Sequence, residues 1–114
     1  MSAVLTEIRL WYWQRLSAMV LAFCVLVHLA MIIYAVRGGL SGAEILARTH
    51  GSVGFGLFYT VFVLACAVHV PIGLARILRE ALHWREPAIR LAAGLFALLL
   101  LVLGLRSVYG VVLS

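Results

Sequence analysis

The chain has 114 residues, of which 66% are hydrophobic and 11% are charged, whereas soluble domains are roughly half apolar and about a quarter charged. This composition excludes a soluble domain and favours an integral membrane protein. The formal net charge of +5 arises from nine arginines at the ends of apolar runs, which is typical of a membrane surface and not of a nucleic-acid-binding face.

The first apolar run spans residues 11–36 and is interrupted by Gln14, Arg15 and Ser17 near its start and by His28 further along. A helix of this length crosses a hydrocarbon core of ~30 Å. The run is too long for the core of a signal peptide, and no small-residue cleavage site follows it. We therefore expect a retained membrane span.

A glycine-rich break at 37–42 ends this span, and residues 43–49 are expected to form one short interfacial turn. The second span is expected at 50–78, with Pro71 removing one backbone donor, and a charged connection leads to the third span at 88–113. The sequence thus predicts an all-α integral membrane protein in which residues 1–114 form a single anchor domain. Cys24 and Cys66 lie inside spans, where we expect reduced thiols that pack as small hydrophobes.

The arginines predict the orientation of the chain. In a three-span protein the N-terminus and the second connection share one side, which carries six of the nine arginines. The positive-inside rule therefore places the N-terminus in the cytoplasm and the C-terminus outside. The expected location is the bacterial cytoplasmic membrane.

Candidate functional residues are the polar ones that a membrane makes costly to bury. His28 shares a helical face with Ser17, Leu21 and Cys24, following the 3.6-residue period. His69 shares a second face with Phe58, Phe62, Gly73, Arg76 and Glu80. The second face offers an aromatic wall, a nitrogen ligand, room beside a glycine and a cation, which together suit a haem and its propionates.

Each of these residues also has a plainer interpretation. An intramembrane histidine often makes only an interhelical hydrogen bond, an explanation that fits His28 better than His69. Arg76 is equally explained as a snorkelling arginine, and Gly73 as a contact between helices. Aromatic residues at the cytoplasmic edge form a belt in this interpretation: Trp11, Tyr12, Trp13 and Trp84.

Residues 68–80, Val-His-Val-Pro-Ile-Gly-Leu-Ala-Arg-Ile-Leu-Arg-Glu, resemble the haem-ligand helix in the membrane anchors of succinate dehydrogenase and fumarate reductase. In these three-helix subunits the second helix bears a histidine, a glycine four residues later and a cytoplasmic acid beyond it. Residues 14–18, Gln-Arg-Leu-Ser-Ala, resemble the start of the first helix. The resemblance covers nearly the whole chain in layout and implies half of a larger anchor helix bundle that holds haem b.

The resemblance implies roles for individual residues. His69 would be an axial haem ligand, His28 a second one, and the haem-lining residues would be Arg15, Ser17, Gly73 and Arg76. Two departures affect the quinone site, because Ala81 replaces the tyrosine that commonly follows the acid and Trp11 replaces a serine one turn before the arginine. Quinone, the implied substrate, would then bind through other groups: Trp13, Arg15, Ser17, Glu80 and His83.

The two histidines are expected at different depths in the membrane. Counting residues along oppositely directed helices separates His28 from His69 by roughly 10 Å along the membrane normal, so the two are not expected to ligate one iron. Their 41-residue spacing resembles that in each half of a dihaem anchor. A second anchor chain, identical or different, would supply the missing ligands and stack two haems across the bilayer.

The implied function is electron transfer. A flavoprotein subunit and an iron–sulfur subunit would dock on the cytoplasmic face, and this chain would hold haem b and shape a quinone site. The alternatives are a cytochrome b subunit of another respiratory dehydrogenase and a structural membrane subunit without a cofactor.

Overall fold

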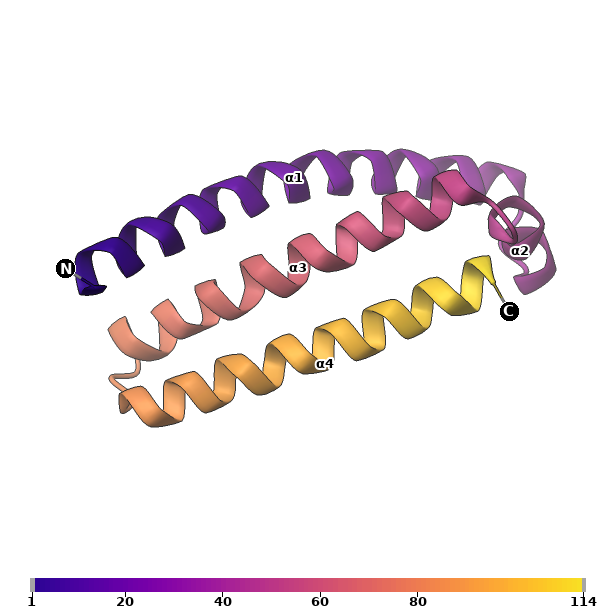
Figure 1. Ribbon diagram of the computed structural model, residues 1–114. Coiled ribbons are helices and arrows are strands. Elements are labelled where there is room, and N and C mark those ends of the chain that lie inside the picture. The colour runs from indigo at the N-terminus through magenta and orange to yellow at the C-terminus, as the bar shows by residue number, and fades with distance from the viewer. Residues whose placement is uncertain (1, 114) are drawn as a thin grey trace.

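The computed structural model describes residues 2–113 as an all-helical chain (Figure 1). Its elements are α1 (Ser2–Gly38), α2 (Gly42–Thr49), α3 (Val53–Glu80) and α4 (Glu86–Val112). The three long helices α1, α3 and α4 are each long and apolar enough to cross a membrane. Met1 and Ser114, the ends of the expected domain, lie outside the described residues.

Helix α1 begins at Ser2, nine residues before the start expected from the apolar run. Residues 2–10 contain no glycine or proline and include Ala3, Leu5 and Glu7, which favour helix. The helix therefore continues beyond its apolar part, and its 37 residues correspond to a length of about 55 Å.

Helix α2 replaces the single turn expected at 43–49. Ser41 caps its N-terminus, accepting a hydrogen bond from the Glu44 backbone N–H at 3.2 Å, and the Ser41 hydroxyl also donates to the Glu44 carboxylate at 2.9 Å. This Ser-x-x-Glu pairing stabilises the first turn of a helix. Just before it, Gly39 has a φ of +121°, and a side chain there would overlap the Glu44 carboxylate, so the turn requires glycine.

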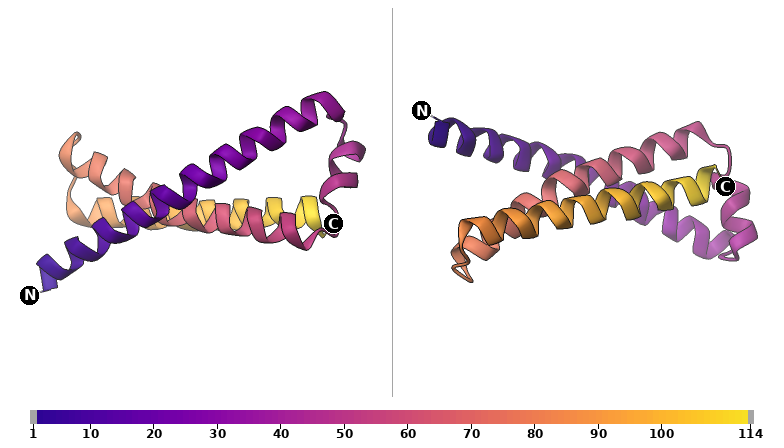
Figure 2. Two further views of the ribbon diagram at one scale, coloured as in Figure 1. Left: turned by 90° about the horizontal axis from the view of Figure 1, so that it is seen from above. Right: turned by 60° about the horizontal axis from the view of Figure 1, so that its bottom comes forward.

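Helices α3 and α4 form an antiparallel hairpin and run side by side along their length (Figures 1 and 2). Small residues allow the close approach: Gly56 faces Val112 and Gly104 faces Val63. Ser52 caps α3 by accepting a hydrogen bond from the Phe55 N–H at 3.2 Å, and α3 continues through Pro71 to Glu80.

Helix α1 crosses this hairpin obliquely, so its second half diverges from α3 and α4 (Figure 2). Helix α2 lies at the wide end. The Thr49 hydroxyl donates to the Val111 carbonyl at 2.6 Å, and the Gly51 N–H donates to the Val112 carbonyl at 2.6 Å. These bonds join α2 and the turn after it to the end of α4, while the first half of α1 packs against α3.

Candidate functional site

The face of α1 that meets α3 carries the polar stripe expected from the helical period. Ser17 and Cys24 are the buried residues of α1, 5% and 2% exposed, and His28 is half-buried. The predicted face shared by Ser17, Leu21, Cys24 and His28 is therefore confirmed as a packing face. Both cysteines are free thiols, as expected.

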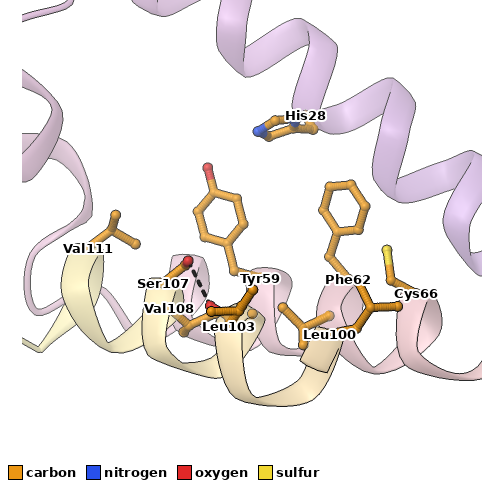
Figure 3. A pocket seen from close by; sticks show the side chains of 11 residues that line it. His28, Tyr59, Phe62, Cys66, Leu100, Leu103, Ser107, Val108 and Val111 are labelled. Atoms are coloured by element: carbon orange, nitrogen blue, oxygen red, sulfur yellow. Dashed lines mark hydrogen bonds between the residues drawn. The ribbon is translucent and has the colours of Figure 1, made fainter. Parts of the chain in front are cut away.

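A cavity of about 550 Å³ lies beside His28, where α1 diverges from the hairpin (Figure 3). It opens to the surroundings on one side. Most of its lining is apolar, and α3 and α4 supply most of it: Tyr59, Phe62, Val63, Cys66, Leu100, Leu103, Gly104, Ser107, Val108 and Val111. Pockets that bind organic ligands and cofactors typically have volumes of about 300–1,000 Å³ and largely apolar linings, and this cavity falls in that range.

Aromatic rings surround His28 edge-on. The centroid of its ring lies 6.0 Å from that of Tyr59 and 5.5 Å from that of Phe62, with interplanar angles of 81° and 75°. In Figure 3 the Tyr59 hydroxyl points to the side of the cavity where His28 lies. Within residues 2–113, neither the His28 ring nor the Tyr59 hydroxyl makes a hydrogen bond, whereas Ser107 donates to the Leu103 carbonyl at 2.8 Å.

His69 has a different environment, at the crossing of α1 and α3. Its Nδ1 is buried and has no hydrogen-bond partner among residues 2–113, and the same is true of Oε1 of Gln14. The Gln14 Nε2 lies 3.4 Å from the position that a Cβ on Gly73 would occupy. Within one chain, the Gln14 amide therefore covers Gly73. Helix α1 occupies the space beside Gly73 that is expected from the sequence to admit a haem macrocycle.

The two histidines lie at different levels of the bundle. The His28 ring contacts Tyr59 and Phe62, which precede His69 by ten and seven residues on α3. At 1.5 Å per residue, these intervals correspond to about 10–15 Å. The two rings thus lie at different levels along the bundle, as residue counting predicts, whereas their depth in a membrane stays a prediction. Between Ser2 and Leu113 there is no group of three or more His, Cys, Asp or Glu side chains that could hold a metal ion.

The other predicted cofactor residues lie around the narrow part of the bundle. Arg15 is exposed and its guanidinium lies 5.5 Å from the Trp11 ring centroid. Ser17 donates to the Gln14 carbonyl at 3.1 Å and lines, with Trp13, a smaller apolar cavity of about 220 Å³. Arg76 is exposed. In the described chain no hydrogen bond or ring contact joins either arginine to His69.

Glu80 and His83 lie at the end of α3 and in the turn that follows, on the same side of the bundle as the start of α1 (Figure 1). Both are exposed, and His83 has a φ of +55°, a left-handed conformation that is uncommon outside glycine. Nearby, Arg79 and Glu86 form an exposed salt bridge with a closest distance of 2.6 Å. Of the predicted quinone residues, Glu80 and His83 thus lie at this end, whereas Trp13 and Ser17 lie beside the middle of α3, where they line the smaller cavity with Val61, Leu64, Ala65 and Val68.

Sequence reasoning missed Gln14, Tyr59 and Ser107. Gln14 precedes Ser17 by three residues and Leu21 by seven, so it continues the stripe that leads to His28, and this signal was available. No role is expected for Tyr59 from the sequence, because one hydroxyl among aromatic residues carries little signal. Ser107 lies on a different helix, and its place at the cavity depends on how α4 packs.

Comparison of the chain with protein-family models, curated proteins and solved structures found no match.

Proposed function

We propose that this protein is a haem b-binding membrane anchor of a succinate:quinone oxidoreductase, with α1, α3 and α4 spanning the membrane. The observation that carries the proposal is the half-buried His28 ring, which has no hydrogen-bond partner in the described chain and faces a largely apolar cavity of about 550 Å³.

Histidine in a membrane span needs a partner, because hydrocarbon offers no water to hydrogen-bond its nitrogens. His28 and Nδ1 of His69 find no such partner in the described chain. A metal is one of the few groups that satisfies an imidazole nitrogen within an apolar wall. Two histidines of this kind, one on each of two adjacent helices, support a cofactor-binding protein over a purely structural subunit.

The two histidine environments fit haem in different ways. The cavity at His28 has the volume and apolar lining for a planar cofactor, and His28 would supply one axial nitrogen. At His69 the Gln14 amide occupies the neighbouring space within the chain, so a haem there would lie at an interface with a second anchor chain. Bound haem would supply one-electron chemistry at iron.

The remaining residues would serve the ends of the cofactor and the substrate. Arg15 and Arg76 are exposed cations on α1 and α3 and would donate hydrogen bonds to propionates or to a quinone carbonyl. Glu80 and His83 at the end of α3 would contribute to quinone binding, and Trp13 would do so from its place beside the middle of α3. The arginines around the α3–α4 turn would contact an iron–sulfur subunit, whose flavoprotein partner oxidises succinate or reduces fumarate.

The proposal includes an orientation. The start of α1 and the α3–α4 turn, which lie at one end (Figure 1), would face the cytoplasm, and α2 and the C-terminus would face the opposite side of a bacterial cytoplasmic membrane.

The test is the haem content and the reduced-minus-oxidised spectrum of the purified chain in lipid nanodiscs. The proposal predicts a b-type spectrum with one haem per chain, the loss of one redox step in His28→Ala and the loss of the other in His69→Ala. His50→Ala is the control, because His50 is exposed and follows α2. A colourless protein would contradict the proposal and favour a structural subunit.

The count of haems separates two versions of the proposal. One haem per two chains, lost in His69→Ala and retained in His28→Ala, would leave the His69 site alone and remove His28 as a ligand. Co-purification of flavin and iron–sulfur subunits tests the identity of the enzyme, and their absence with full haem content would favour another respiratory cytochrome b.

A further inference from the structure

In the part of the chain that the structure describes, two buried side-chain atoms have no hydrogen-bond partner: Oε1 of Gln14 on α1 and Nδ1 of His69 on α3. Buried polar groups in proteins are nearly always paired, and each exception calls for an explanation. The requirement is stricter in a membrane span, where water cannot replace the missing partner. One atom is an acceptor and the other belongs to a ring that can donate from it.

The two side chains lie near the same contact between α1 and α3, although no hydrogen bond joins them in the described chain. The Gln14 Nε2 lies 3.4 Å from the Cβ position of Gly73. Gly73 is four residues after His69, and residues with this spacing are neighbours on one helix face. Rotation of the Gln14 amide about its last side-chain bond exchanges its oxygen and nitrogen, which turns the acceptor toward α3. Because Nε2 in its present position does not bond to His69 Nδ1 in the described chain, the proposed bond also requires a change in the other side-chain torsions of Gln14 or His69, with the helices in place.

We propose that Gln14 is a positioning residue for His69, whose Nδ1–H donates a hydrogen bond to the Gln14 side-chain oxygen. This bond holds the neutral imidazole in the Nδ1–H tautomer and leaves the lone pair of Nε2 free to bind a metal. The hydrogen bond stands independently of the function proposed above, and only its consequence for haem rests on that function.

Other groups near the crossing are already engaged or unsuitable. The Ser17 hydroxyl donates to the Gln14 backbone carbonyl at 3.1 Å, so it is already engaged within α1. Backbone carbonyls of α3 near His69 accept hydrogen bonds within the helix, except that of Ala67, to which Pro71 has no N–H to donate. Ala67 lies about 200° around α3 from His69, on the opposite face. Gly73 has no side chain, and its small size is what allows the Gln14 amide to reach this depth.

The role matches what a ligating histidine needs from its surroundings. Such histidines almost always donate their second N–H to a carbonyl or carboxylate, which fixes the ring orientation and raises the basicity of the ligating nitrogen. A more basic ligand stabilises ferric over ferrous iron. Removing the acceptor should therefore raise the reduction potential of a haem bound at His69.

The first experiment uses the full-length chain without haem, with ¹⁵N-labelled histidine, in lipid nanodiscs. Nitrogen chemical shifts report the tautomer of each histidine, and the His69 signals are assigned by their loss in His69→Ala. We expect a single Nδ1–H tautomer in the wild type, loss of that preference in Gln14→Leu, and its recovery in Gln14→Glu, which keeps an oxygen acceptor of the same reach.

The matched control is Thr60→Val. It removes another polar group of α3, whose hydroxyl donates to the Gly56 carbonyl of the same helix at 2.6 Å, and it should leave the His69 signals unchanged. A wild-type His69 in the Nε2–H tautomer, or unchanged His69 signals in Gln14→Leu, would overturn the proposal. If Gln14→Leu does not insert, through-bond coupling between His69 Nδ1–H and the Gln14 side-chain carbonyl in the wild type decides the question.

The second experiment adds haem to the same samples. Loss of the second partner of a metal ligand typically weakens metal binding by about 10- to 100-fold. We expect that loss of affinity, with a higher reduction potential, in Gln14→Leu and near-wild-type behaviour in Gln14→Glu. Failure of the wild type to bind haem would overturn the proposed function, while a fixed Nδ1–H tautomer would still support the Gln14–His69 hydrogen bond.

Discussion

Gly104 of α4 lies directly against Val63 of α3, so close that a Cβ on Gly104 would lie 2.6 Å from the nearest Val63 methyl carbon. Valine is rigid about its first side-chain bond, so it cannot easily move aside. The absence of a side chain at Gly104 therefore sets the separation of α3 and α4 beside the cavity.

Gly104→Ala should destabilise the hairpin by about 1–3 kcal/mol, the usual cost of adding a carbon to a tightly packed contact. Val63→Ala in the same chain should recover most of this loss because it removes the clashing methyl groups. The free energy of unfolding in mixed micelles measures both effects. Gly94→Ala is the control, because apart from the local backbone of α4 no described atom lies within 4 Å of its Cβ position, and an equal loss there would contradict the explanation.

Thr49→Val should loosen α2 from the end of α4. The Thr49 side chain is 6% exposed and its hydroxyl lies 2.6 Å from the Val111 carbonyl, so its loss should cost about 0.5–1.5 kcal/mol. Hydrogen exchange of the Gly51 amide, which bonds to the Val112 carbonyl, should become up to about tenfold faster. Thr60→Val should leave this rate unchanged, and unaltered exchange in Thr49→Val would show that the hydroxyl does not hold α2.

Tyr59→Phe should change the properties of a haem bound at His28 without altering the helices. The variant keeps the ring that contacts His28, Phe55 and Phe58 and removes the only group on it that forms hydrogen bonds. We expect a shifted reduction potential of the His28-dependent redox step. Tyr109→Phe is the control, because Tyr109 is exposed on α4 and lies outside the cavity lining, and it should leave the reduction potential unchanged. A reduction potential that is also unchanged in Tyr59→Phe would show that the Tyr59 hydroxyl does not act on a haem bound at His28.

The orientation can be measured with single cysteines in a chain whose Cys24 and Cys66 are replaced by alanine. Thr6→Cys lies near the start of α1 and Glu44→Cys on α2, at opposite ends of the bundle. In intact cells, a membrane-impermeant thiol reagent should label the chain with Glu44→Cys and spare the chain with Thr6→Cys. The reverse pattern would place the N-terminus outside.

The sequence predicts the long helices well because their signal is local. Apolar runs of sufficient length and a 3.6-residue period require no knowledge of neighbouring helices, and the buried positions of Ser17 and Cys24 follow from that period. Two local signals were nevertheless missed. The residues before Trp11 favour helix but are less apolar, so the apolar run begins after them. The Ser41–Glu44 capping pair stabilises a helix at α2, where a single turn is expected from the sequence.

The arrangement of the candidate site was less predictable because it depends on contacts between distant residues. The amide of Gln14 covers Gly73, 59 positions later in the sequence, and no local pattern pairs them. The cavity beside His28 exists because α1 crosses the hairpin obliquely, and helix crossing angles depend on the shapes of both packed surfaces. The sequence therefore indicates the two histidines and their different levels along the bundle, but it does not indicate which of them lies beside a cavity.

The sideways opening of the cavity beside His28 has a consequence for how any ligand reaches it. In the proposed membrane setting, the mouth faces acyl chains, and a molecule enters by lateral diffusion within the bilayer. The relevant concentration is then the mole fraction of ligand in the lipid, which for a strongly apolar molecule greatly exceeds its aqueous concentration. Lipid tails compete for the same volume, so occupancy should depend on acyl-chain length and branching at a fixed ligand-to-lipid ratio.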